Sequence, residues 1–376
     1  QKSSGEQRTP EQRIADAVLL MGSKDYARAA TVLNEVVEKY PDHPTAYPDA
    51  LSLLGETYFR SRQYLSANRT FKEVVNRGGE PRFASYQAKA LGRLVDIALR
   101  IKSYESLDEI FASMSKVPPS AVGSALAYAK GKGLFAKKDY AGARAALASV
   151  DGKSEYLHQA QYLLGLVAVK EATPPSEPLK EGDAPPQVPK ERYAGAISLF
   201  QKVTQLPPDT PEHKQVIDLS WLAIGRLLYE ADQWTQAVQA YNHIDRTSPE
   251  FGTMLYELAW VYVRIGDVDR AQRALEVLAI ADPNSQNIAD GSLLRADLML
   301  RAGQFDKSLK VYEASATRTT RCARGSTPSS ARRATLPSTT TSSARSSSRR
   351  STTALSCRRS PCSGRARPRT GRRPSP

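Results

Sequence analysis

The feature that most constrains this sequence is a pattern of large and small residues that occurs twice in succession between residues 221 and 283. In both copies, apolar residues recur three or four positions apart, which places them on one face of a helix. A small residue such as Gly225 or Ala259 lets two antiparallel helices approach closely, and a bulkier side chain there would cost about 1–3 kcal/mol. A proline closes each copy, because it cannot continue a helix. One such helix pair cannot bury its own apolar face, so the pattern predicts a repeat protein.

Weaker copies of the same pattern extend from residue 10 to residue 315, and we expect about eight of them. One position in the second helix of each copy, which is small in most copies, marks the register of the repeat. Successive marker positions are 34 to 41 residues apart, except where one insertion intervenes. These positions are Ala29, Ala67, Leu107, Ala143, Ala196, Ala237, Ala271 and Ser308. Eight units are enough for a continuous core in which each unit contacts only its neighbours.

The best copy carries a resemblance to a known family. The residues that carry it are Trp221, Ile224, Gly225, Leu228, Trp234, Ala237, Tyr241, Ile244 and Pro249. Their spacing resembles the tetratricopeptide repeat (TPR), a helix-turn-helix unit of about 34 residues. The resemblance implies an all-α fold, a right-handed α-solenoid of about eight TPR-like repeats. It also implies that the first helix of each repeat lines the concave face of the solenoid.

The chain begins at Gln1, which we interpret as the start of a fragment or of a processed chain. We expect residues 1–9 to form a frayed N-terminus and residues 10–315 to form the solenoid, with Thr9 capping the first helix before Pro10. Residues 172–190 contain six prolines and no apolar periodicity. They predict a solvated loop inserted into the fifth repeat.

The composition changes abruptly after residue 315. Residues 316–376 contain 15 Arg, no Lys, no Asp and no Glu, and 25 of the 61 residues are Ser or Thr. The whole chain has a net charge of +14 and this segment alone carries +15, so residues 1–315 have a net charge near −1. A segment of this composition cannot bury enough apolar surface to fold, so it predicts a disordered C-terminal tail.

Two interpretations of this tail are open. It could be a basic arm that contacts the phosphates of a nucleic acid. We favour the alternative that it is a frameshifted reading of a G+C-rich gene, because arginine without lysine begins inside the second helix of the eighth repeat. Nucleic acid is therefore expected as a partner only if the tail is a genuine sequence.

No residue pattern predicts catalysis, and we expect that the protein is not an enzyme. The four histidines are scattered, and residues 1–315 contain no cysteine, so we expect no metal site and no cofactor. The Gly131-Lys132-Gly133 segment lacks the remaining residues of a phosphate-binding loop and falls inside an expected helix. Binding of a protein partner is what remains.

The resemblance places candidate partner-binding residues on the first helices of the repeats. Aromatic and arginine side chains in a groove are typical anchors for peptides or helices. The candidates are Phe59, Arg60, Tyr162, Leu222, Arg226, Tyr229, Tyr256, Trp260 and Arg264. Tyr162 and Tyr256 have an alternative role as padding between helices. Trp260 is favoured because its neighbours Leu258 and Ala259 already fill the positions at the helix interface.

The expected function is that of a non-catalytic scaffold that binds a peptide, a helix or a domain in the concave groove. The Ala- and Arg-rich composition of the chain and its degenerate repeats resemble those of bacterial envelope scaffolds. We therefore expect the protein in the periplasm or the cell envelope, and the alternative is a cytoplasmic regulatory TPR module. No run of 18 apolar residues occurs, so we expect no membrane span. The first helices lack the asparagine that the chaperone-binding clamp of this family uses, which argues against a chaperone co-factor.

Overall fold

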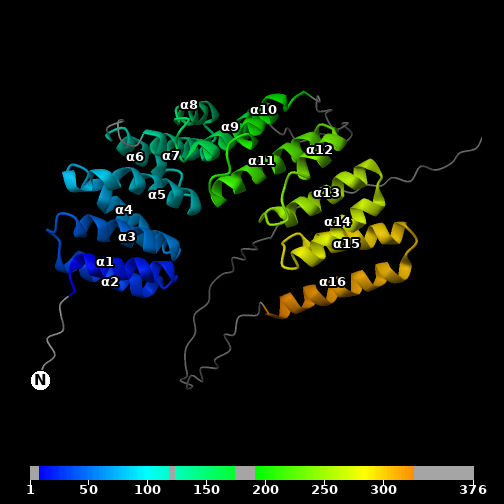
Figure 1. Cartoon of the computed structure of the whole chain (residues 1–376), viewed down its shortest axis with the longest axis horizontal. Coiled ribbons are helices and arrows are strands. Elements are labelled where there is room, and N and C mark those ends of the chain that lie inside the picture. Colours follow the sequence, from blue (N-terminus) through cyan, green and yellow to red (C-terminus); the bar gives the residue numbers. More distant parts are fainter. Residues whose placement is uncertain (1–7, 118–122, 174–190, 326–376) are drawn as a thin grey trace, which may run out of the picture. The chain divides into compact units, whose positions relative to one another are not determined.

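The computed structural model describes residues 8–117, 123–173 and 191–325. Within these ranges the chain forms sixteen α-helices and one short 3-10 helix, with no β-strand. Every described helix belongs to one unit of the chain that ends at Gly325, which we call the first unit. The first unit is an all-α solenoid, as predicted (Figure 1).

The α-helices form eight consecutive hairpins, the number that the sequence predicted. The pairs are α1 (Pro10–Gly22) with α2 (Tyr26–Lys39), α3 (Ala46–Arg60) with α4 (Tyr64–Asn76), α5 (Gln87–Arg100) with α6 (Ser106–Met114), α7 (Gly123–Ala136) with α8 (Tyr140–Ala148), α9 (Leu157–Ala172) with α10 (Ala194–Thr204), α11 (Pro211–Glu230) with α12 (Trp234–Tyr241), α13 (Phe251–Ile265) with α14 (Val268–Ala281), and α15 (Ile288–Arg301) with α16 (Phe305–Gly325). The 3-10 helix η1 (Pro81–Tyr86) precedes α5 and explains the longer third repeat.

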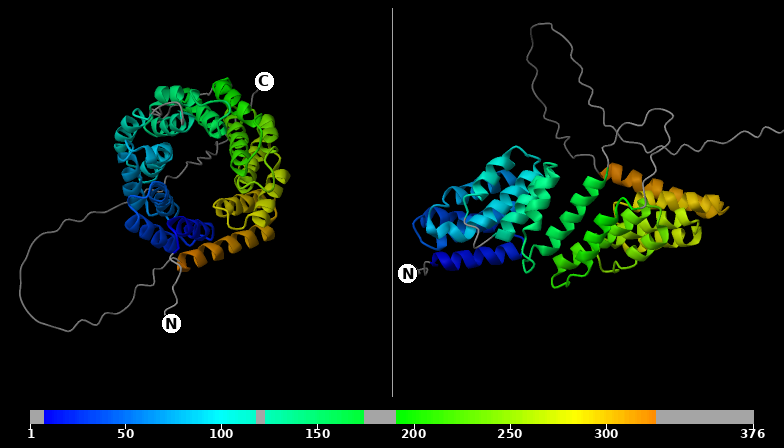
Figure 2. Two further views of the ribbon diagram at one scale, coloured as in Figure 1. Left: turned by 60° about the vertical axis from the view of Figure 1, so that its left-hand side comes forward. Right: turned by 90° about the horizontal axis from the view of Figure 1, so that it is seen from above.

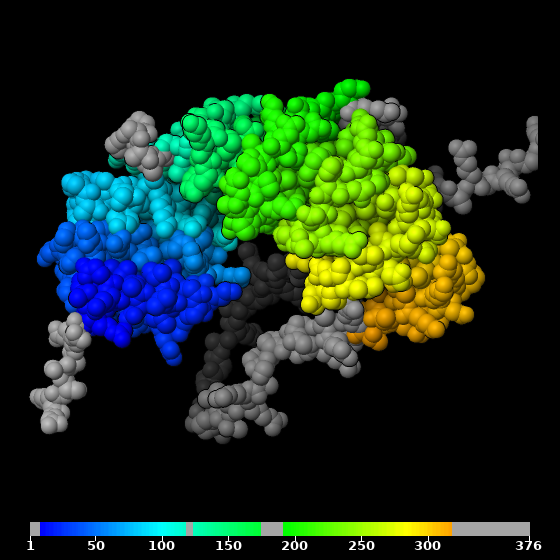
Figure 3. Space-filling model, in the orientation of Figure 1, coloured from blue at the N-terminus to red at the C-terminus, as the bar shows by residue number. Residues whose placement is uncertain are grey.

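Each hairpin packs on the next in chain order. The two helices of a pair contact each other, and the second helix of the pair contacts the first helix of the following pair. Figure 2 shows this succession in two further views, and Figure 3 shows successive hairpins in contact on the face that is drawn. The core is therefore a chain of linked apolar clusters, and the largest of them extends from α10 to α15.

The register that the sequence predicted for the second helices is confirmed by burial. All eight marker positions, from Ala29 to Ser308, are at most 2% exposed. Glycine on the first helix makes room for a large partner side chain: a Cβ atom at Gly225 would lie 2.6 Å from the ring of Tyr241. The third hairpin differs. Gly225 precedes its marker Ala237 by twelve positions, and in the third hairpin the residue twelve positions before the marker Leu107 is the buried Val95. The glycine of that helix, Gly92, is not at a close contact, because a Cβ atom there would meet no atom within 4 Å.

The turn inside each hairpin has one backbone conformation that recurs. In seven of the eight hairpins, the residue five positions before the marker has a positive φ between 57° and 90°. These residues are Lys24, Arg62, Lys102, Lys138, Asp232, Gly266 and Gly303. A non-glycine residue pays about 1–2 kcal/mol for this conformation, so the packing of the hairpin, and not local preference, fixes the turn in five of them.

The first helix begins where the sequence predicted. Thr9 Oγ1 accepts a hydrogen bond from the amide of Gln12, and the Gln12 side chain accepts one from the amide of Thr9. Aspartate side chains cap the second helices α2, α8 and α14 in the same manner, each accepting from the amide three residues on. Such caps contribute about 1 kcal/mol each.

The end of the solenoid differs from the predicted boundary. Helix α16 continues to Gly325, ten residues beyond residue 315. The rest of the predicted tail, most of the predicted loop insertion (174–190) and residues 1–7 lie outside the described residues, so the frameshift and the loop stay predictions. Within the described ranges, no helix is long and apolar enough to cross a membrane.

Candidate functional site

Four of the nine predicted binding residues line one cavity of about 490 Å³. These four are Arg226, Tyr229, Trp260 and Arg264, and the cavity is completed by Glu230, Asp232, Tyr241 and Glu257. We call these eight residues the groove pocket. They come from the first helices α11 and α13, from the turn that follows α11, and from the end of α12.

An ion pair across the two first helices forms one wall of the groove pocket. The Arg226 Nε atom lies 2.9 Å from Glu257 Oε2, and its Nη2 atom lies 2.6 Å from Glu257 Oε1. This two-pronged geometry is the strong form of an arginine–carboxylate contact. The hydrogen bond to Glu257 raises the pKa of Arg226 above its ordinary value. The pair therefore fixes the distance between α11 and α13 at the groove.

The position of this wall depends on a buried tyrosine. The Tyr241 ring is 1% exposed and packs against Gly225, while its hydroxyl donates a hydrogen bond of 3.1 Å to Glu257 Oε2. Burial, followed by the negative charge of Glu257, raises the pKa of Tyr241. The hydroxyl therefore stays protonated and serves as a permanent donor. The glycine that the sequence pattern requires thus also positions Glu257.

Trp260 presents an open indole to the groove pocket. Its side chain is 39% exposed, whereas its neighbours Leu258 and Ala259 are buried, as the sequence predicted. Within the described ranges, the Trp260 ring takes part in no aromatic pair or cation–π contact. An exposed tryptophan in a cavity is the residue type that most often anchors a protein partner.

A second contact between α11 and α13 joins an arginine to a tyrosine. Arg264 Nε donates a hydrogen bond of 3.2 Å to the hydroxyl of Tyr229, and its guanidinium lies 5.9 Å from the centre of the Tyr229 ring. The Tyr229 hydroxyl, through this hydrogen bond, raises the pKa of Arg264. Next to this pair, Glu230 Oε1 accepts a hydrogen bond of 2.9 Å from the hydroxyl of Tyr193.

Three predicted residues on the same part of the chain do not reach the groove pocket. The prediction that Leu222 is exposed is wrong: it is 2% exposed and belongs to the core between α10 and α15. It lies one turn before Arg226 on the same face of α11, but at this level the side chain packs into the core cluster. Tyr162 and Tyr256 are partly buried against the same core, and the Tyr162 ring lies 5.5 Å from the Phe200 ring. Both therefore pad the helix interfaces, as the alternative interpretation held.

The two remaining predicted residues, Phe59 and Arg60, lie in a different region of the solenoid. The Phe59 ring is covered by Arg93, whose guanidinium is 4.6 Å from the ring centre, and by Arg100 at 5.2 Å. Arg60 Nε donates to Glu56 Oε1 at 3.0 Å. Glu56, on the same helix, is only 3% exposed. The predicted residues of the second repeat thus contact neighbours within the chain.

Glu56 belongs to a run of paired charges on α3, α5 and α7. Its two carboxylate oxygens accept from Arg93 Nε and Nη2 at 2.8 and 2.9 Å, Arg93 Nη1 lies 3.2 Å from Asp96 Oδ2, and Asp96 pairs with Lys132. We call Glu56, Arg93, Asp96 and Lys132 the polar ladder. Burial of Glu56 acts to raise the pKa of its carboxyl, but the hydrogen bonds from Arg93 act in the opposite direction and the pKa lies below its ordinary value.

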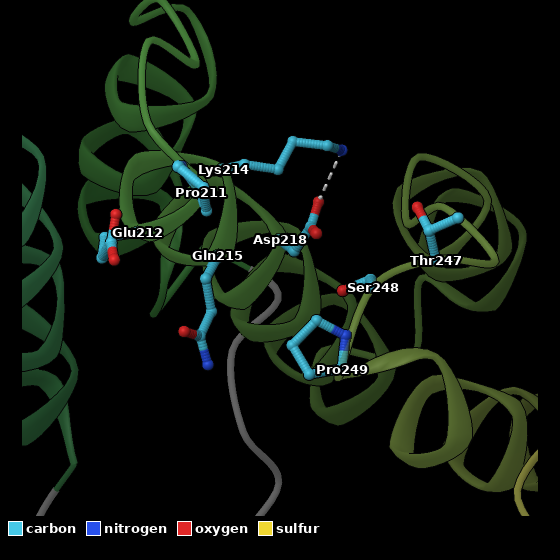
Figure 4. Close-up of a pocket in the computed structure, with 8 residues that line it drawn as sticks. All are labelled: Pro211, Glu212, Lys214, Gln215, Asp218, Thr247, Ser248 and Pro249. Carbon is cyan, nitrogen blue, oxygen red and sulfur yellow. Dashed lines mark hydrogen bonds and ion pairs between the residues drawn. The ribbon is translucent and has the colours of Figure 1, made fainter. Parts of the chain in front are cut away.

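A second cavity, of about 300 Å³, lies at the start of α11 and the loop after α12 (Figure 4). Its principal charged group is Asp218, which is buried and whose Oδ1 atom lies 3.3 Å from Lys214 Nζ. The same ammonium group is 2.8 Å from Asp245 Oδ2. No predicted residue lies here. Its lysine is already shared by two carboxylates, and it presents no exposed aromatic ring.

The described part of the chain contains no group of three or more His, Cys, Asp or Glu residues that could hold a metal ion. Two of the histidines nevertheless meet in space. The rings of His158 and His213 stack with their centres 3.9 Å apart. The pairing joins the starts of α9 and α11, and the two histidines lie 55 residues apart in the sequence. It could not be read from spacing along one helix.

The acidic residues of the groove pocket were missed by the sequence analysis. Glu257 precedes Trp260 by three residues, and Trp260 occupies the position equivalent to Arg226 one repeat later. The repeat register, combined with one helical turn, could therefore have identified Glu257 as the partner of Arg226. Glu230, the last residue of α11, could have been found in the same way, because it lies one helical turn after Arg226. For Asp232 no such signal exists, because the turn after α11 places it.

Comparison with known proteins agrees with the repeat pattern. Two family models described as tetratricopeptide repeat match residues 17–43 and 228–291, and no curated protein matches the chain. Among solved structures, a tetratricopeptide repeat protein from Parabacteroides merdae is similar at 12% identity, with 75% of this chain and 96% of that chain covered and a TM-score of 0.48.

Two further solved structures have lower TM-scores. PilF from Pseudomonas aeruginosa is similar at 16% identity, with 75% and 95% of the two chains covered and a TM-score of 0.40. The quorum sensor NprR from B. thuringiensis is similar at 10% identity, with 82% and 97% covered and a TM-score of 0.45.

Proposed function

The chain is a tetratricopeptide repeat protein, and from this premise we propose that it is a non-catalytic scaffold that binds a segment of another protein at the groove pocket. The segment is a peptide, a helix or the edge of a domain. The observation that carries this proposal is the exposed indole of Trp260 inside a cavity whose walls are built from two successive first helices.

The construction of the groove pocket supports binding rather than packing. Its rear wall is rigid, because Arg226, Glu257 and Tyr241 form one hydrogen-bonded group. Trp260 and Arg264 line the same cavity and are exposed. A rigid rear wall with an exposed aromatic anchor lowers the entropy cost of binding, because few side chains must be ordered when the partner arrives.

The proposal is tested by capture of partners from extracts of the source cells with the full chain, the Trp260→Ala variant and the Tyr104→Ala variant. Tyr104 is the matched control, since it is an aromatic residue that is 41% exposed on another hairpin. We expect Trp260→Ala to weaken binding of the specific partner by at least about 2 kcal/mol, or roughly thirtyfold. Equal capture by all three proteins would overturn the proposal.

Both variants should fold normally, because each removes a partly exposed side chain. Circular dichroism and the thermal midpoint provide this control. The expected place in a bacterial envelope assembly stays a prediction, and fractionation of the source cells tests it against the cytoplasmic alternative. The nucleic-acid alternative concerns the tail, most of which lies outside the described residues, and it also stays a prediction.

A further inference from the structure

The charges of the groove pocket do not cancel. Arg226 and Glu257 neutralise each other through their two-pronged contact. The other carboxylate and guanidinium groups that line the cavity are those of Glu230, Asp232 and Arg264. Two carboxylates therefore face one guanidinium, and the pocket has an excess of one negative charge.

Within the described ranges, neither Glu230 nor Asp232 forms an ion pair, and the hydrogen bond that Glu230 accepts comes from the uncharged hydroxyl of Tyr193. Arg264 is also without a carboxylate in ion-pair distance in the described part of the chain. Its Nε–H bond is directed at the Tyr229 hydroxyl. Glu230 and Asp232 thus retain their capacity to accept hydrogen bonds from outside.

The indole beside these carboxylates suits the same type of ligand. Tryptophan has the strongest negative ring face of the aromatic side chains, and it attracts a lysine ammonium or, more often, an arginine guanidinium. The Trp260 ring is exposed in the cavity and contacts no cation of the described chain. Elsewhere in this solenoid, the ring of Phe59 on a first helix is covered by two arginines of the same chain, Arg93 and Arg100.

We propose that the groove pocket selects a basic side chain of the partner protein, with its charge compensated by Glu230 and Asp232 and its apolar or planar part resting on Trp260. The inference rests on the proposed function and specifies the chemistry of the partner. An acidic side chain is disfavoured, because Arg226 is already neutralised and the field of two carboxylates opposes an anion at Arg264. An apolar side chain alone would leave Glu230 and Asp232 without compensation.

The test uses small probes on the full chain, with nuclear magnetic resonance of the tryptophan indole N–H groups as the readout. The Trp260 resonance is assigned with the Trp260→Phe variant. The probes are N-acetyl-arginine amide and N-acetyl-lysine amide, compared with N-acetyl-citrulline amide, which has the shape of arginine without the charge, and with N-acetyl-glutamate amide. We expect saturable shifts of the Trp260 resonance in the millimolar range with the two basic probes, and binding of citrulline weaker by roughly tenfold.

The variants separate a local effect from a change in net charge. The double variant Glu230→Gln, Asp232→Asn should weaken binding of the arginine probe by roughly tenfold, because it removes both compensating charges. The control Asp108→Asn, Glu109→Gln removes the same charge from the exposed face of α6 and should leave binding unchanged. Arg264→Gln should strengthen it, because a competing cation is removed.

Equal binding of the arginine and citrulline probes would overturn the inference, and so would preference for the glutamate probe or an unchanged affinity in the double variant. Absence of any shift would overturn it as well. If capture of the partner nevertheless depends on Trp260, the proposed function stands and only the chemistry of the ligand is wrong. If capture does not depend on Trp260, the proposed function itself fails, whatever the probes do.

Discussion

The polar ladder and the groove pocket are built from the same helices of their hairpins but differ in how many of their charges are paired. Both are built on first helices of neighbouring hairpins, and both contain a two-pronged arginine–glutamate contact, Arg93 with Glu56 and Arg226 with Glu257. In the polar ladder the contact continues through Asp96 to Lys132 until every charge has a partner. In the groove pocket the contact stops after one pair.

The difference follows from the residues that stand beside the pair. In the ladder, charges of opposite sign alternate along α5 and α7, so each new residue neutralises the last. In the groove pocket the equivalent places carry the uncharged Trp260 and one further cation, Arg264, which forms no ion pair with Glu230 or Asp232 within the described ranges. The first helices of this solenoid thus pair their own charges in one region and leave carboxylates without an ion pair, within the described ranges, in another.

The largest effect is expected from breaking the polar ladder at Glu56. Glu56→Ala removes both charge-assisted hydrogen bonds that the partly buried Arg93 guanidinium donates to Glu56 and leaves Asp96 as its remaining carboxylate. The loss of these two hydrogen bonds should destabilise the protein by about 3 kcal/mol. Urea denaturation measures the change in the free energy of unfolding. The matched variant Arg60→Ala removes the more exposed partner of the same carboxylate and should cost less than about 1 kcal/mol. Equal costs for the two variants would contradict the ladder.

A smaller effect is expected from disturbing the support of the groove pocket. Gly225→Ala places a Cβ atom against the Tyr241 ring and should destabilise the fold by about 1–3 kcal/mol through overpacking. Partner binding should weaken as well, because Tyr241 positions Glu257. The control is Gly92→Ala in the middle of α5, where the added Cβ atom would meet no other atom within 4 Å.

That control should stabilise the protein by about 0.5–1 kcal/mol, since alanine loses less conformational entropy in a helix than glycine does. Thermal unfolding of the two variants distinguishes the cases. A stabilised Gly225→Ala variant would show that the close contact with Tyr241 is not required.

The smallest effect is expected at the contact between α9 and α11, where the rings of His158 and His213 stack. His158 Nε2 is 2.9 Å from the carbonyl oxygen of Pro207, and His213 Nε2 is 3.1 Å from that of Glu155. A carbonyl only accepts, so both Nε2 atoms carry the hydrogen, and both Nδ1 atoms are buried without a partner. Burial lowers the pKa of His158 below its ordinary value of 6.5, against the effect of the Pro207 hydrogen bond.

The sign of the pH dependence follows from this lowered pKa. Below pH 6.5 the unfolded chain binds a proton at His158 more readily than the folded chain does, so stability is complete above pH 6.5 and falls as the pH decreases through the lowered value. We expect the thermal midpoint to decrease between pH 7.5 and pH 5, and a His158→Gln variant to lose part of that decrease. An identical pH profile in the variant would refute the role of the pair.

The sequence determined the repeat and its register. The small positions from Ala29 to Ser308 are all buried, and Thr9 caps the first helix, because helical periodicity and capping are local properties that the order of residues encodes directly. The exposure of Trp260 was predictable for the same reason, since its neighbours in the helix already occupy the buried face.

Only the tertiary structure decided how side chains on different hairpins pair. Leu222 is buried and Phe59 is covered by two arginines, and the sequence indicated neither, because both depend on the angle at which one hairpin packs on the next. The same angle brings Glu230 and Asp232 beside Trp260 and stacks His158 on His213. Within a helix the spacing of residues fixes which side chains are neighbours, whereas between helices the geometry of packing does so, and that geometry is set by the whole core.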